Sequence, residues 1–127
     1  MDHAALTGLA ARIETDRAYD AGLTQVAFEA VGAHLPRLDQ AMIRNGALGG
    51  TDAVLMVIDH GLPGWSVAIN GTASEADGHW VCTLRRSADD AEEALIGSGH
   101  GPLLSNVLIA ALLRALVRRA EAVADSG

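Results

Sequence analysis

The chain has 127 residues, a net charge of -7 and only 3% aromatic residues. This length suits one domain, and an apolar half that includes 24 alanines predicts a core of small aliphatic side chains on closely packed helices. The composition excludes collagen, disordered chains and disulfide scaffolds. All nine bases are arginine, and the acidic excess disfavours direct binding to nucleic-acid phosphates.

The number of cysteines and the hydropathy of the sequence indicate the cellular compartment of the protein. The single cysteine, Cys82, has no partner for an internal disulfide, and no charged start leads into an apolar run. The longest apolar tract, 103–117, is shorter than the roughly 20 residues of a membrane span. We therefore expect a cytoplasmic protein without membrane association, which is the host cytoplasm if a phage encodes it.

Two N-terminal segments carry apolar residues at helical spacing: Leu6, Leu9, Ala10 and Ile13, then Leu23, Val26, Ala27, Ala30 and Val31. We predict helices over about 3–17 and 21–34, the second capped by Asp20 and ended by the approach to Pro36. Pro36 then opens a short third helical turn, which we expect Asn45 and Gly46 to terminate.

The segment 51–61 contains a continuous apolar run that suits either a buried strand or a buried helix. Thr51 is a suitable N-cap, Asp52 complements the helix dipole, and Gly61 stands where a left-handed C-terminal cap would fall. These termini favour the helix.

Period-two alternation predicts strands over 65–70 and 79–85, joined by a polar turn over 71–78. A short third strand is expected at about 93–97. The glycine segment, Gly97–Gly101, should then break the chain, and Pro102 should open a final helix to about 124.

The final helix is apolar on nearly every side between residues 103 and 117. Either the N-terminal helices or a second copy must cover it, and we expect a homo-oligomer, most simply a dimer, with this stretch in the interface. The fold class is one α+β domain. Residues 1–50 form a helical N-terminal segment, and residues 51–124 form a helix, antiparallel strands and a long C-terminal helix.

Three short motifs carry a family resemblance: Leu9–Glu14 (LAARIE), Leu62–Val67 (LPGWSV) and Leu112–Leu116 (LLRAL). Together they resemble the phage ABA-sandwich domain, found in small proteins encoded by phages and prophages. The resemblance implies a helix before the Leu-Pro-Gly-Trp turn and a small antiparallel sheet packed between helices. The stretch 19–50 matches it least.

Most members of that group have no assigned activity, and some similar phage proteins counter bacterial immunity by sequestering nucleotide second messengers at subunit interfaces. The resemblance thus implies a non-catalytic phage or prophage accessory protein that binds a small phosphorylated or nucleotide signal. The alternative is an acidic interaction or structural module without a small ligand, such as an inhibitor that occupies a nucleic-acid-binding surface.

The glycine segment is the candidate phosphate site, because successive glycines let backbone N–H groups converge before a helix N-terminus. We expect a ligand to contact Gly99, His100 and Gly101, with Arg114 or Arg85 completing the charge. A tight structural connection explains the same glycines.

Arg114 stands in an otherwise apolar stretch and needs a partner, for which Asp39, Asp59 or exposure at the helix edge would also serve. Nearby acids, Asp89, Asp90, Glu92 and Glu93, are expected to form a solvated loop, since they lack the order of a calcium loop.

Catalysis and metal binding have no constellation to support them. The five histidines and Cys82 show no metal-ligand spacing, no nucleophile elbow occurs, and no cofactor is expected. Cys82, Trp65 and Trp80 lie on the apolar parity of their strands and are predicted to be core residues, whereas His79 and Arg85 share the other face. The order of elements resembles a double-stranded RNA-binding domain in outline, but the final helix lacks its basic start.

Overall fold

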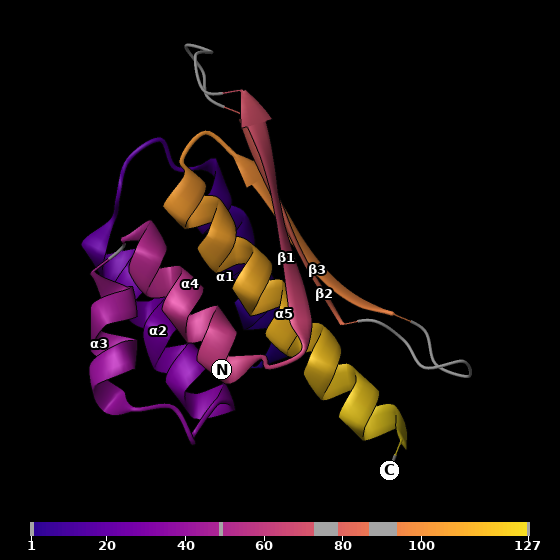
Figure 1. Ribbon diagram of the computed structural model, residues 1–127. Coiled ribbons are helices and arrows are strands. Elements are labelled where there is room, and N and C mark those ends of the chain that lie inside the picture. Colours follow the sequence, from indigo (N-terminus) through magenta and orange to yellow (C-terminus); the bar gives the residue numbers. More distant parts are fainter. Residues whose placement is uncertain (1, 49, 73–78, 87–93, 127) are drawn as a thin grey trace.

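The computed structural model describes residues 2–48, 50–72, 79–86 and 94–126. Within these ranges, five helices and a three-stranded antiparallel sheet confirm the α+β class and the helical N-terminal segment (Figure 1). The helices are α1 (His3–Thr15), α2 (Ala21–His34), α3 (Gln40–Ala47), α4 (Thr51–Gly61) and α5 (Leu104–Ser126). The strands are β1 (Trp65–Thr72), β2 (His79–Arg86) and β3 (Leu95–Gly101).

Aspartate caps begin the first three helices. The Asp2, Asp20 and Asp39 side chains each accept a hydrogen bond from a backbone N–H two or three residues further along the chain. The bounds of α2 and its Asp20 cap are as predicted, and α1 ends two residues early.

The start and end of α3 differ from the prediction. The helix begins after Asp39 instead of at Pro36, and Asn45 and Gly46 lie inside it. Gly46 is there because the Phe28 ring packs against it, so that a Cβ at this position would lie 2.8 Å from Phe28 Cζ. This glycine makes room for a neighbour and does not end the helix.

The segment 51–61 is a helix, as predicted from its terminal residues, but the predicted N-cap and C-cap residues were wrong. Gly50 is the N-cap, Thr51 is the first helical residue, and Gly61 is the last. A Cβ on Gly61 would lie 2.6 Å from Leu35 Cδ1, so this glycine also permits close packing. The left-handed backbone falls at Gly64 (φ 85°), which is the residue that turns the chain into β1.

The sheet has the strand order β1-β2-β3, with β2 in the centre. The prediction that the glycine segment breaks the chain was wrong. The segment forms most of β3, with Gly99 opposite Cys82. Gly97 and Gly99 are buried against α5, where a Cβ on Gly99 would lie 2.7 Å from the Val107 carbonyl oxygen, and Gly101 is buried against the Glu14 backbone of α1. The predicted turn over 71–78 is shorter, since β1 continues to Thr72, and residues 73–78 lie outside the described part.

Helix α5 is the centre of the core. It begins at Leu104 instead of Pro102, contacts α1, α2, α4, β2 and β3, and is buried at every position from 105 to 113. The stretch predicted to form an oligomer interface is therefore covered within one chain, which is the other outcome the composition allowed. None of the helices in the described ranges is long and apolar enough to cross a membrane.

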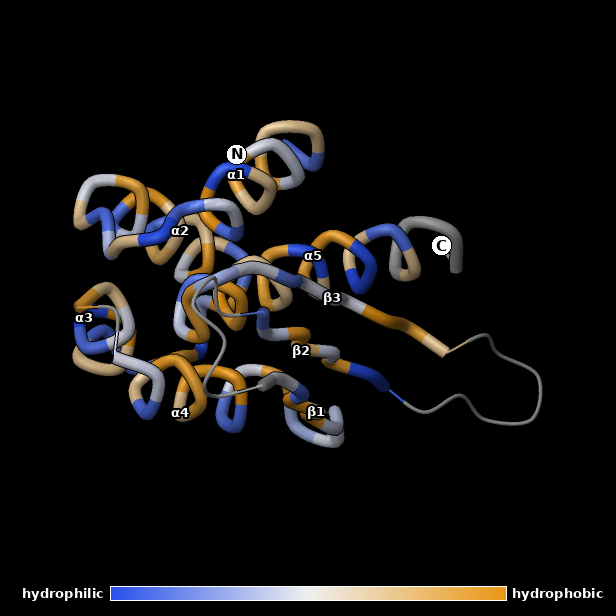
Figure 2. The backbone as a smooth tube through the Cα atoms, turned by 90° about the horizontal axis from the view of Figure 1, so that it is seen from above, coloured by the Kyte–Doolittle hydropathy of each residue, from blue (hydrophilic) through white to orange (hydrophobic). Residues whose placement is uncertain are grey.

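All the helices that contact the sheet lie on one of its faces (Figures 1 and 2). The other face carries the exposed side chains of Ile96, Ser98 and His100 from β3, and of Val81 and Arg85 from β2. The sheet implied by the family resemblance is packed between helices, whereas in the described residues the helices lie on one face of the sheet only.

Candidate functional site

The predicted phosphate position is already occupied by a carboxylate of the chain itself. The backbone N–H of His100 donates to Glu14 Oε2 at 3.2 Å. The Arg114 guanidinium donates to both Glu14 oxygens, at 2.5 and 2.7 Å, and to the Ser98 carbonyl oxygen at 2.8 Å. The partner of Arg114 is thus Glu14, not Asp39, Asp59 or solvent.

Both members of this pair are held in their charged forms. Burial raises the pKa of Glu14, but the hydrogen bonds from Arg114 and from the His100 backbone lower it by more in total, so that the pKa lies below its ordinary value. The hydrogen bond to Glu14 raises the pKa of Arg114 against the opposing effect of burial. An external phosphate would have to displace a bidentate, largely buried carboxylate.

The remaining residues of the predicted site do not come together. Gly99 faces α5 and Gly101 faces the Glu14 backbone of α1, both at distances that leave no room for a methyl group. Arg85 lies on β2 opposite Ile96, on the face of the sheet that has no helices. The acidic stretch Asp89–Glu93 lies outside the described residues.

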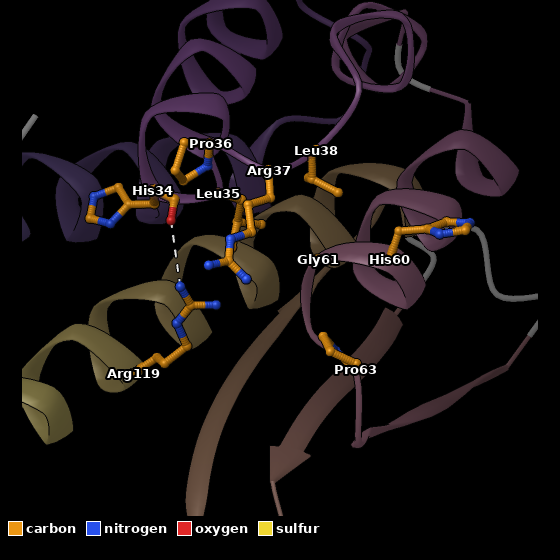
Figure 3. A pocket seen from close by; sticks show the side chains of 9 residues that line it. All are labelled: His34, Leu35, Pro36, Arg37, Leu38, His60, Gly61, Pro63 and Arg119. Carbon is orange, nitrogen blue, oxygen red and sulfur yellow. Dashed lines mark hydrogen bonds between the residues drawn. The ribbon is translucent and has the colours of Figure 1, made fainter.

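A different cleft gathers cationic side chains (Figure 3). It has a volume of about 470 Å³ and lies among the α2–α3 connection, the end of α4 and the second half of α5. We call it the arginine cleft; its lining residues are His34, Leu35, Pro36, Arg37, Leu38, His60, Gly61, Pro63 and Arg119.

Two guanidinium groups meet in the arginine cleft. Figure 3 shows the Arg37 and Arg119 side chains turned towards each other, and one Arg119 nitrogen lies 3.5 Å from the His34 carbonyl oxygen, at the long limit for a hydrogen bond. Neither arginine forms an ion pair with any residue in the described ranges. Among the residues that the structure describes, no carboxylate lines the cleft, although the chain carries 16 acids.

The negative ends of two helices account for part of the clustering of arginines in the cleft. Helices α2 and α4 end beside the cleft, at His34 and Gly61, and each C-terminus carries roughly half a unit of negative charge. Arg119 complements the end of α2, which is a structural role. Two full positive charges exceed two half charges, so the charges of the lining residues and the two helix ends add up to a positive balance that suits an anion.

Other residues that the sequence singled out belong to the core or to the surface. Cys82 is fully buried, and burial raises the pKa of its thiol to about 11, so that the thiol is protonated at neutral pH. Trp65 and Trp80 are half-buried against the core. The His79 and His100 rings lie 5.9 Å apart on the open face of the sheet, and the described residues contain no cluster of three or more potential metal ligands.

The sequence pattern does not indicate the arginine cleft, because the residues that line the cleft lie far apart in the chain. Arg37 follows a proline turn and Arg119 follows the apolar part of α5, and neither position carries a motif. No family model, curated protein or solved structure matches this chain. The resemblance to the phage ABA-sandwich domain therefore stays a prediction.

Proposed function

We propose that this protein is a non-catalytic binder that holds a small phosphorylated ligand, of the nucleotide class, in the arginine cleft. The observation that carries the proposal is that Arg37 and Arg119 line one cleft with no carboxylate among its described lining residues, in a strongly acidic chain. Two like charges in one cleft repel each other, and an anion between them relieves the repulsion. The planar fork of arginine grips phosphate through paired hydrogen bonds.

The shape and the walls of the cleft support a ligand larger than phosphate alone. Its volume of about 470 Å³ lies within the usual range of small-molecule sites. Leu35, Leu38 and Pro63 supply apolar surface beside the arginines, where the base or sugar of a nucleotide could pack. In the phage setting that the family resemblance implies, such binding would sequester a nucleotide signal and counter bacterial immunity.

The first experiment looks for a ligand that copurifies. Protein purified without added nucleotide is denatured and ultrafiltered, and the filtrate is separated by chromatography with detection at 260 nm. A released nucleotide supports the proposal and identifies the ligand. The same protein is then titrated calorimetrically with phosphate, pyrophosphate and linear and cyclic nucleotides.

Matched variants locate the site. Arg37→Ala and Arg119→Ala should each weaken binding by about 10- to 150-fold, because a hydrogen bond to a charged group contributes about 1.5–3 kcal/mol. Arg118→Ala is the control, since Arg118 directly precedes Arg119 on α5, pairs with Glu121 and does not line the cleft. Equal losses in all three variants would show nonspecific attraction and contradict the assignment.

The alternative function has a distinct outcome. If nothing is released and neither phosphate nor any nucleotide binds, the proposal is wrong. An acidic interaction module without a small ligand then becomes the better hypothesis, in which the net charge of -7 would direct the chain to a basic, nucleic-acid-binding partner.

A further inference from the structure

The two edges of the sheet differ in a way that points to a partner strand. Because β2 is central, β1 and β3 are both edge strands. An edge strand presents unpaired backbone N–H and C=O groups, which recruit a further strand unless the protein protects them.

The edge of β3 is protected. Two of its backbone groups are taken by the Glu14–Arg114 pair, since the His100 N–H donates to Glu14 and the Ser98 carbonyl accepts from Arg114. The carboxylate and the guanidinium thus stand in for the acceptor and donor of a neighbouring strand. Helix α1 also packs against the end of β3, at Gly101.

The edge of β1 has no such protection. Its eight residues, Trp65–Thr72, contain no charged residue and no proline. Within the described ranges, no side chain donates to or accepts from the backbone of β1. Figure 2 shows β1 at the edge of the sheet remote from α1.

An apolar strip, Val67 and Ile69, lies along the unprotected strand. These residues are opposite Leu84 and Cys82 and therefore share the face that packs on the helices. Leu84 and Cys82 are fully buried, yet Val67 and Ile69 are 40% and 38% exposed. The helical layer covers the centre of the sheet and leaves the strip on β1 uncovered.

We propose that β1 pairs antiparallel with β1 of a second copy about a two-fold axis, so that one continuous sheet runs through both copies. With the axis perpendicular to the sheet at Ala68, Val67 of each copy lies opposite Ile69 of the other. The helices of both copies then lie on the same side, and the two apolar strips cover each other. Because the strand is uncharged, two chains of charge -7 meet without like charges at the seam.

A second copy is the occupant that this edge fits best. Two-fold pairing is self-complementary, and each residue pair across the seam occurs twice. The dimer uses β1 instead of the buried surface of α5. It leaves Arg37 and Arg119 outside the seam, so this proposal stands or falls independently of the ligand proposal.

The oligomeric state tests the proposal. Sedimentation equilibrium from micromolar to millimolar concentration should give twice the chain mass of 13.1 kDa. Ile69→Lys should give a monomer with unchanged far-ultraviolet circular dichroism, because a charge on the apolar strip opposes pairing. The control is Ile96→Lys, which places the same charge at a site of similar exposure (45%) on β3 and should leave the dimer intact.

Crosslinking gives a second readout that does not depend on a destabilising charge. An Ala68→Cys chain should form an intermolecular disulfide under mild oxidation, since residues paired across the axis have Cα atoms about 4.5–5.5 Å apart. Ser98→Cys on β3 should not. A wild-type monomer at every concentration, or a dimer lost in Ile96→Lys and kept in Ile69→Lys, overturns the proposal, as does equal crosslinking at both positions.

Discussion

Removing the Glu14 charge should destabilise the fold far more than removing an exposed ion pair. In Glu14→Gln the amide keeps the size of the carboxylate but leaves Arg114 without its counter-charge. Breaking a buried pair costs about 3–5 kcal/mol, and the Arg114 side chain is 27% exposed, so water relieves part of that cost. We expect a loss of about 3 kcal/mol, which corresponds to a fall in Tm of about 10 °C for a chain of this size.

Urea unfolding followed by circular dichroism measures this loss. The control is Arg118→Ala, which removes the exposed Arg118–Glu121 pair (nitrogen–oxygen distance 3.4 Å) and should cost at most about 0.5 kcal/mol. Replacing both buried charges together, in Glu14→Leu with Arg114→Met, should recover much of the loss, because no uncompensated charge remains.

The pH dependence identifies the cause. The folded-state pKa of Glu14 is lowered, so its contribution is complete above the ordinary carboxyl value of 4.5 and is lost as the pH falls through the lowered value. Wild type should therefore lose stability in acid more steeply than Glu14→Gln. If Glu14→Gln costs no more than Arg118→Ala and the two chains respond to acid alike, the pair does not stabilise the fold and the reasoning is refuted.

Three further predictions concern glycines and the thiol. Gly99→Ala should cost about 3 kcal/mol or prevent folding, because its Cβ would meet the Val107 carbonyl oxygen on α5, whereas Ser98→Ala on the exposed face should change the unfolding free energy by less than about 0.5 kcal/mol. Gly8→Ala should stabilise α1 by about 0.5–1 kcal/mol, since nothing lies within 4 Å of the added carbon, whereas Gly64→Ala should destabilise by about 1–2 kcal/mol at its φ of 85°; opposite signs in urea unfolding check the pair. Cys82 should resist a thiol reagent in the native chain and react in denaturant, and rapid native labelling would contradict its burial.

Local signals determined much of the α+β fold. Helix α2 begins and ends at the predicted residues because its Asp20 cap and apolar spacing act within a few turns. The end of strand β3 was predicted wrongly for an equally local reason: three of its four buried positions are glycines, so the hydropathy of the sequence does not reveal the alternation of buried and exposed residues. The glycine segment, predicted to be a loop, is a strand whose glycines let α5 pack closely against it.

Long-range packing determined the candidate sites. Glu14 and Arg114 stand 100 positions apart, and only the packing of α1 on α5 makes the carboxylate the anion that the sequence assigned to a ligand. Arg37 and Arg119 meet because α2 ends where α5 passes. By itself the sequence determined the helices, two strands and an acidic chain that needs its few arginines neutralised. The tertiary structure alone decided that Arg114 is already paired and that Arg37 and Arg119 still face an open cleft, because charge pairing depends on distance in space.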